Sequence, residues 1–143
     1  MCIGNRGGGD DAIGPYIADQ LKKETLKDTL VLDCGTIPEN YTSIVKKHKP
    51  NTLILIDATD MGLEPGEIRL IPKHKIGTMH ISTHGIPLSI LMNYLEEYVE
   101  NILFLGIQSK SMVGLINKIV KKNGNKLILN IINNNLCEIR ILK

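Results

Sequence analysis

Residues 52–56 read Thr52-Leu53-Ile54-Leu55-Ile56, and every position after the first carries a large aliphatic side chain. A short run that is apolar on both faces is typical of a strand in the middle of a parallel sheet. The run continues directly into Asp57-Ala58-Thr59-Asp60. Because open α/β sheets bind ligands beyond the carboxyl ends of their strands, this acidic end is a candidate functional site.

On both sides of this strand, apolar runs alternate with amphipathic stretches. The pattern predicts further strands at residues 1–3, 29–33, 67–71 (an edge strand) and 102–107, and helices at residues 11–23, 40–48, 87–99 and 112–122. A terminal hairpin is predicted from residues 127–132 and 137–142. This order predicts an α/β fold with a parallel or mixed sheet covered on both faces.

Composition narrows the functional classes. The 143 residues are enough for one domain, residues 1–143, and the net charge is only +2 without a basic stripe carrying aromatics, so no nucleic-acid partner is expected. No apolar run approaches the roughly 20 residues of a membrane helix, so no membrane insertion is expected. The cysteines are Cys2, Cys34 and Cys137, without a CxxC pair, which favours a reducing, cytoplasmic location.

A glycine-rich stretch follows the first short strand and reads Gly4-Asn5-Arg6-Gly7-Gly8-Gly9-Asp10-Asp11-Ala12-Ile13-Gly14-Pro15. Gly7-x-Gly9-x-x-Ala12 matches a relaxed dinucleotide fingerprint, and Asp33 has the position of a ribose-binding acid. However, Asp10 and Asp11 occupy the helix N-terminus that would receive the pyrophosphate, and their charges would repel it. The alternative is a tight turn in which the two acids cap the helix.

Two further groups of polar residues follow predicted strands: Asp57 with Asp60, and His84 in Ser82-Thr83-His84. Each has a structural interpretation, as a loop cap for the acids and as a hydrogen-bonded loop residue for His84. Together with Asp11, however, they would supply carboxylate oxygens and an imidazole, which suit a first-row divalent metal with open positions. The residues alone therefore leave a metal-binding hydrolase as one interpretation among these.

Several motifs together resemble one known family, in order and over about residues 3–112. They are Gly4-Asn5, Gly9-Asp10-Asp11 with Gly14-Pro15, Asp33-x-Gly35-x-x-Pro38-Glu39-Asn40, Asp57-Ala58-Thr59-Asp60-Met61-Gly62-Leu63-x-Pro65-Gly66-Glu67-Ile68-Arg69, Thr83-His84-x-x-Pro87-Leu88 and Phe104-Leu105-Gly106-Ile107-Gln108. The chain resembles the [NiFe]-hydrogenase maturation endopeptidases, most closely the type that processes the large subunit of formate-hydrogenlyase (hydrogenase 3) enzymes.

This resemblance implies a three-layer α/β/α sandwich around a mostly parallel twisted sheet, of the phosphorylase/hydrolase-like kind. It implies a cytoplasmic, monomeric peptidase of aspartic or metal-dependent type. Such an enzyme removes the C-terminal extension of a [NiFe]-hydrogenase large-subunit precursor once nickel has been inserted. The family's nickel-contacting and catalytic residues fall on Asp11, Asp57 and His84. The resemblance implies that these residues recognise nickel that the substrate precursor supplies. The glycines of residues 4–14 would then leave clearance for this peptide-borne metal.

The sequence also departs from the family pattern in two places. Only three residues precede Gly4, where the family has a longer strand, and the tail from about residue 113 is atypical and lacks the expected terminal helix. Two alternatives therefore stay open at this point. One is a catalytically inactive homologue that binds a hydrogenase precursor or a metal, and the other is a nucleotide-binding α/β domain.

Overall fold

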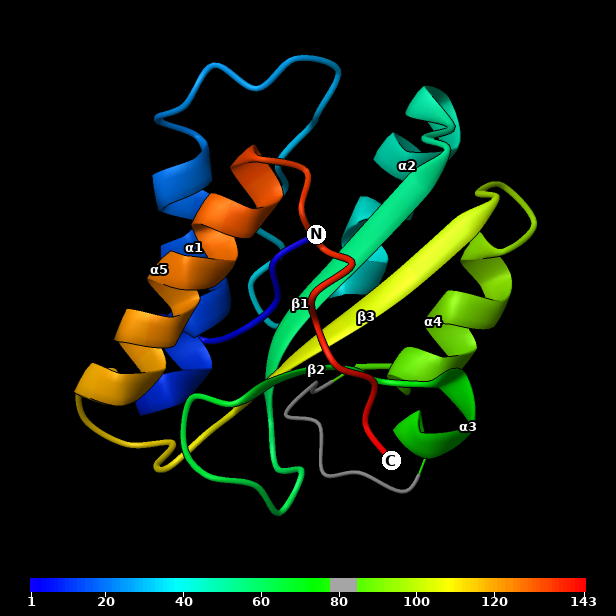
Figure 1. Cartoon of the computed structure of the whole chain (residues 1–143). Helices are drawn as coiled ribbons and strands as arrows, with labels where there is room; N and C mark the ends of the chain where they lie inside the picture. The colour runs from blue at the N-terminus through cyan, green and yellow to red at the C-terminus, as the bar shows by residue number, and fades with distance from the viewer. Residues whose placement is uncertain (78–84) are drawn as a thin grey trace.

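The computed structural model describes residues 1–77 and 85–143, and its centre is a sheet of three strands (Figure 1). β1 (Thr52–Thr59) runs parallel to β3 (Asn101–Gln108), and β2 (Ile68–Leu70) runs antiparallel to β3 in the order β1-β3-β2. β1 contains the apolar run that was predicted as a central strand, and β2 occupies the edge, as its alternation of polar and apolar residues indicated.

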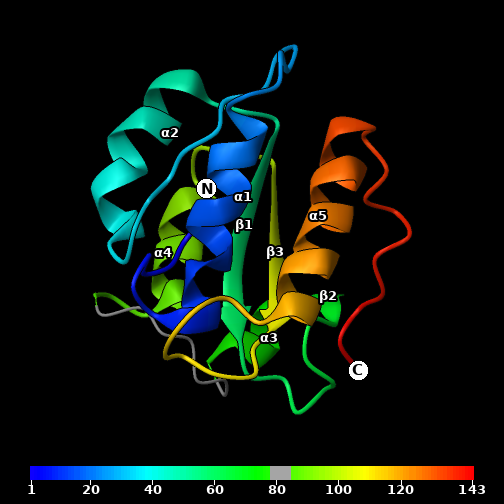
Figure 2. The same ribbon diagram turned by 90° about the vertical axis from the view of Figure 1, so that its left-hand side faces the viewer.

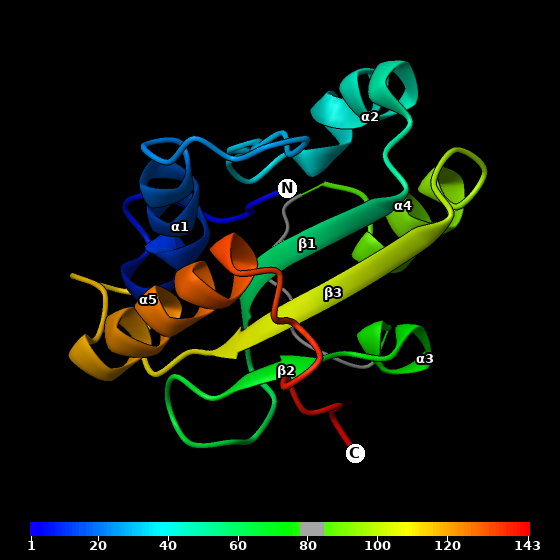
Figure 3. The same cartoon turned by 45° about the horizontal axis from the view of Figure 1, so that its top comes forward.

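Helices cover both faces of the sheet, as Figure 3 shows. α1 (Ile13–Leu21) and α5 (Lys118–Ile132) lie on one face, while α2 (Thr42–His48) and α4 (Leu88–Leu95) lie on the other, where the short α3 (Lys73–Ile76) contacts α4. Each face has its own apolar cluster, built almost entirely from aliphatic side chains. The predicted α/β/α sandwich with its mixed, largely parallel pairing is therefore confirmed.

The first residues of the chain extend the sheet beyond β1. Met1 and Ile3 donate backbone hydrogen bonds to Ile54 and Ile56 of β1, while Cys2 exchanges backbone hydrogen bonds with residues 32 and 34 on its other side. Residues 1–3 are 7% exposed or less, so this short segment is held centrally and on both sides. The strand predicted at residues 29–33 is wrong except for one bridge at Asp33, because the pairing with residues 1–4 reaches only residues 32–35.

The last third of the chain also differs from the prediction. Residues 112–117 form a loop instead of a helix, and residues 127–132 belong to α5, so the predicted hairpin is wrong. The carboxylate of Asp10 takes the backbone N–H groups of residues 110, 111 and 117, which keeps this segment out of a helix. α5 is the terminal helix that the chain was predicted to lack, so that prediction is wrong. It packs closely on α1 at Gly124, where a Cβ would lie 2.7 Å from Ile13 Cδ1.

The remaining helices agree with their predicted apolar stripes. Ile13, Ile17 and Leu21 of α1 are buried, and a 3-10 turn, η1 (Gly9–Ala12), leads into that helix. The inward residues predicted for α4 are buried as well: Leu88, Leu91, Met92 and Leu95. Within residues 1–77 and 85–143, no helix is both long and apolar enough to span a bilayer.

The three cysteines are free thiols with different surroundings, which predicts their reactivity. Cys2 and Cys34 are buried, and burial raises the pKa of Cys2 and raises the pKa of Cys34 to about 12, whereas Cys137 is exposed. Because the thiolate is the reactive form, we expect one thiol to react quickly with a disulfide reagent in the native protein and three after unfolding. Cys137→Ser should remove the fast phase, and a fast phase that persists in this variant would contradict the assignment.

Candidate active site

Asp57 lies near the carboxyl end of β1 and is completely buried. Neither of its carboxylate oxygens makes a hydrogen bond of normal geometry to a described residue. Burial, followed by the nearby charge of Asp11, raises the pKa of Asp57 well above its ordinary value of 3.8, and the backbone N–H of Ala58 counteracts this only in part. A buried carboxyl group without a partner is costly to the fold, so its presence here points to a function.

The second predicted site residue, Asp11, is brought to Asp57 by the η1 turn, which contacts β1. Asp11 is 4% exposed, and its Oδ2 accepts a hydrogen bond of 2.9 Å from the backbone N–H of Asn5. The two carboxyl groups therefore form a buried pair with unequal surroundings. Such a pair is suited to acid–base chemistry or to holding a cation.

Asp10 has a different role from its neighbour. It is 0% exposed, and its Oδ2 accepts the N–H groups of Lys110 and Ser111 at 2.7 and 3.0 Å, while Oδ1 accepts that of Asn117 at 2.6 Å. The sequence showed two adjacent acids but could not distinguish them. The tertiary structure assigns Asp10 to the loop that follows β3 and Asp11 to the candidate site.

Asp60 behaves as the loop cap that the sequence allowed. Its Oδ1 accepts the backbone N–H of Gly62 at 3.1 Å and the side-chain Nε2 of Gln108 at 3.2 Å. Gln108 in turn accepts the N–H groups of Met61 and Leu63, at 2.6 and 3.2 Å. Gln108, the last residue of the motif at residues 104–108, therefore fixes the turn after β1. Of these two acids, only Asp57 is therefore a candidate for a catalytic or metal-binding role.

Two residues beside Asp57 were not singled out from the sequence. Thr59, on the same face of β1, is fully buried, and its hydroxyl also has no hydrogen-bond partner among the described residues. Gly106 lies directly opposite Asp57 on β3, where a Cβ would come within 2.4 Å of Ile71 Cδ1 and 2.7 Å of Thr59 Oγ1. A glycine in a strand often marks such a close approach, which is the signal that the sequence offered.

His84, the third predicted site residue, lies outside the described residues, so its placement beside the two acids stays a prediction. The neighbouring Gly85 is described, and a Cβ there would lie 1.8 Å from Oε1 of Glu39. Oε2 of Glu39 is buried and unpartnered among the described residues. Within residues 1–77 and 85–143, no three His, Cys, Asp or Glu side chains are grouped closely enough to hold a metal ion.

Three of the glycines of residues 4–14, namely Gly4, Gly9 and Gly14, serve the packing of the chain itself, which corrects for these three the interpretation that they clear space for a ligand. A Cβ at Gly4 would lie 1.9 Å from the carbonyl oxygen of Asp11, and one at Gly14 would lie 2.0 Å from that of Ile3. Gly9 adopts φ +61°, and a Cβ there would lie 2.5 Å from the backbone nitrogen of Val113. These contacts bring η1 against residues 1–3 and against the loop after β3.

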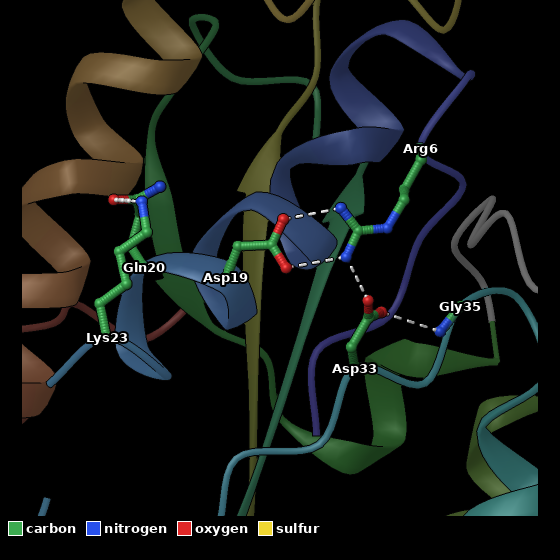
Figure 4. Close-up of polar contacts among 6 residues, drawn as sticks. All are labelled: Arg6, Asp19, Gln20, Lys23, Asp33 and Gly35. Atoms are coloured by element: carbon green, nitrogen blue, oxygen red, sulfur yellow. Dashed lines mark hydrogen bonds and ion pairs between the residues drawn. The ribbon is translucent and has the colours of Figure 1, made fainter. Parts of the chain in front are cut away.

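A cluster of charges holds the outer side of the same glycine-rich stretch, as Figure 4 shows. The guanidinium group of Arg6 bonds both oxygens of Asp19 at 2.7 and 2.9 Å and Oδ2 of Asp33 at 2.5 Å. Asp33 also accepts the N–H of Gly35 at 3.2 Å. Asp33 is thus engaged by Arg6, and Gly9 of the fingerprint packs against the backbone of residues 111–113, so the structure gives no support to dinucleotide binding by this loop.

We expect Arg6→Ala to cost little stability, about 0.5–1 kcal/mol, because the Arg6 and Asp19 side chains are 57% and 43% exposed and water screens their attraction. Arg6 lowers the pKa of Asp19, so the contribution is present above about pH 4 and is lost as pH falls through the lowered pKa. Urea unfolding at low and high salt measures this effect, which salt should reduce. Arg140→Ala, at an exposed arginine, is the control, and an equal loss there would contradict the prediction.

Comparison with known proteins decides the family. The family model for hydrogenase maturation protease (HycI) matches residues 15–134. The chain belongs to the hydrogenase maturation protease family. It is 40% identical over 109 residues to the hydrogenase 3 maturation protease of Escherichia coli K12, which covers 76% of this chain and 70% of that protein. The chain is therefore a peptidase, as the sequence motifs predicted.

Solved structures of this family have the same fold. The solution structure of the endopeptidase HycI from Escherichia coli superposes with a TM-score of 0.90 at 32% identity, covering 99% of this chain and 94% of that one. The crystal structure of the [NiFe] hydrogenase maturation protease HycI from Thermococcus kodakarensis gives a TM-score of 0.83 at 32% identity, covering 94% and 88%. The family match extends through α5, the part of the tail that was predicted to be atypical.

Proposed function

We propose that this protein is the endopeptidase that removes the C-terminal extension from a [NiFe]-hydrogenase large-subunit precursor after nickel insertion. Membership in the maturation protease family supports the reaction class, and the relative from Escherichia coli is named for hydrogenase 3. The observation that carries the proposal is Asp57, a fully buried carboxyl group without a hydrogen-bond partner among residues 1–77 and 85–143, placed beside a second buried acid, Asp11.

In this proposal the nickel belongs to the substrate, and the protease recognises it. The carboxyl groups of Asp11 and Asp57 would contact it, together with His84, whose part rests on the sequence motif. Two carboxylate oxygens and an imidazole are weak, open ligands for a first-row divalent ion. A bound cation would also compensate the negative charge that burial disfavours at Asp57, so metal-loaded substrate has a reason to bind that metal-free substrate lacks.

Hydrolysis needs a water molecule that attacks the carbonyl carbon of the scissile peptide bond. In the aspartic-type route, a carboxylate of the Asp11–Asp57 pair accepts the proton of this water, and a protonated carboxyl group returns a proton to the departing amine. In the metal-dependent route, the substrate's nickel activates the water, and the same carboxyl groups orient the metal. The raised pKa of Asp57 supports the aspartic-type route, because it provides a carboxyl group that can hold the proton which this route returns to the amine.

The proposal is tested by incubating the protein with nickel-loaded and nickel-free precursor and following the precursor's mass. Loss of the C-terminal peptide from the loaded form alone supports a nickel-reading protease. Binding of the precursor without any cleavage, by protein that is folded, would support an inactive homologue instead. A rise in melting temperature with NAD but not with precursor would support the nucleotide-binding alternative.

Cytoplasmic localisation and a monomeric state belong to the same proposal. The three cysteines support the first, because all are free thiols and a reducing compartment keeps thiols in that state. Light scattering of the purified protein would measure the second, and a stable dimer at micromolar concentration would contradict it.

A further inference from the structure

The loop between β3 and α5 is the second unusual feature of the structure. In this loop the side chains of Val113 and Leu115 are 77% and 93% exposed, more than any other large hydrophobic side chain of the described residues. Met112 in the same loop is 38% exposed, and Ile119 in the first turn of α5 is 54% exposed. Contiguous apolar side chains left in water usually mark a surface that another molecule covers. We call residues 111–116 the apolar loop.

The apolar loop is held in a fixed shape from beneath. Asp10 accepts backbone N–H groups at both ends of it, at residues 110, 111 and 117, and its own N–H donates to the carbonyl oxygen of Ser111 at 2.8 Å. Asn117 then caps α5, because its side chain accepts the N–H of Ile119 at 2.9 Å. A fully buried carboxylate therefore maintains a loop that shows apolar side chains to water, and such a fixed shape costs a partner little ordering entropy.

The apolar loop is tied to the candidate active site through consecutive residues. Asp10 holds the loop, and Asp11 lies close enough to Asp57 for its charge to raise the pKa of that residue. Both acids belong to the single turn η1. Figure 2 shows residues 109–117 beside this turn, at the end of the sheet where β1 and β3 finish. A substrate protein whose scissile peptide bond is bound at Asp57 therefore also lies close to this loop.

Charge further defines the partner. Between residues 101 and 137 the sequence contains five lysines and no acidic residue, and Lys110 and Lys118 are exposed on either side of the apolar loop. A surface that combines apolar side chains with flanking positive charge fits a partner with apolar residues bordered by acidic ones.

We propose that the apolar loop is the docking surface for the folded part of the precursor, adjoining the cleavage point, through Val113 and Leu115 with Lys110 and Lys118 as charged flanks. This inference rests on the proposed function, because its partner is the protease's own substrate. The loop binds the precursor and presents its C-terminal segment to Asp11 and Asp57. It thereby contributes to KM and leaves the chemical step to the two acids.

The first experiment compares cleavage of nickel-loaded precursor by the wild type and by the double variant Val113→Ser/Leu115→Ser. We expect KM to rise by at least about tenfold with kcat unchanged, because central apolar contacts carry most of an interface's energy. Leu129→Ser, at a leucine of α5 that is 58% exposed, is the matched control and should keep the wild-type KM. Urea unfolding confirms that both variants are folded.

The second experiment measures binding in the absence of turnover. In an Asp57→Asn background, Lys110→Glu should weaken binding of the precursor about tenfold at low salt and less at high salt, whereas Lys47→Glu on α2 should not. If the wild type cleaves no precursor, the proposed function fails. If it cleaves and the double variant keeps the wild-type KM, only the docking surface is wrong. A double variant that merely changes a dimer into a monomer, with KM unchanged, would overturn the docking surface too.

Discussion

We expect Asp57→Asn to lower the rate of cleavage of nickel-loaded precursor by at least about a thousandfold while the protein stays folded. Asparagine has nearly the same shape as aspartate, but it can neither exchange a proton nor offer a charged oxygen to a metal. Catalytic acid–base groups contribute on the order of 10²–10⁴ in rate, and the second role adds to this. Mass spectrometry of the precursor measures the loss. Asp19→Asn on the surface of α1 is the control and should cleave normally.

The same substitution is expected to stabilise the fold at neutral pH, by about 0.5–2 kcal/mol. The pKa of Asp57 is raised in the folded state, so the folded protein retains a proton that the unfolded chain releases near pH 4. The wild type therefore loses stability as pH rises from about 4 toward the raised pKa, and the asparagine variant is spared this loss. The two proteins should unfold at similar urea concentrations below pH 4 and diverge above it. A variant that is less stable at pH 7 would contradict a functional cost at Asp57.

Asp10→Ala should lower the free energy of unfolding by at least about 3 kcal/mol. The substitution leaves the N–H groups of residues 110, 111 and 117 without their buried acceptor, and hydrogen bonds to a charged group contribute about 1.5–3 kcal/mol each before their non-additivity is counted. Urea unfolding measures the loss, and hydrogen exchange should be faster at those three amides in particular.

Two variants make the Asp10 result specific. Asp10→Asn keeps one acceptor oxygen and should lose less stability than Asp10→Ala, whereas Glu24→Ala, at an exposed acid after α1, should change the free energy of unfolding by less than about 0.5 kcal/mol. If Asp10→Ala unfolded at the wild-type urea concentration, the carboxylate would not be holding the loop. Because Asp10 lies next to Asp11, reduced cleavage by the alanine variant is expected as well and does not by itself test the prediction.

The sequence was most informative where local pattern and burial agree. The apolar run at residues 52–56 became the buried core of β1, and the stripes at Ile13 and Leu91 became the inner faces of α1 and α4. Prediction failed where a distant residue decided the local structure. Residues 112–117 were predicted to begin a helix, but a carboxylate about a hundred positions earlier accepts N–H groups at both ends of this segment, and the segment is a loop.

By itself the sequence determined the layered α/β fold, the family and the candidate acids, because periodic apolar patterns and closely spaced motifs are local properties of the chain. Only the tertiary structure decided which acid does what. Asp10 and Asp11 are neighbours of identical chemistry, yet one is satisfied by the loop after β3 and the other meets Asp57. Likewise, the apolar character of residues 112–116 is visible in the sequence, but their exposure beside the candidate site is not. Burial and hydrogen-bond partners depend on segments that are far apart in the chain. For that reason they could be learned only from the tertiary structure.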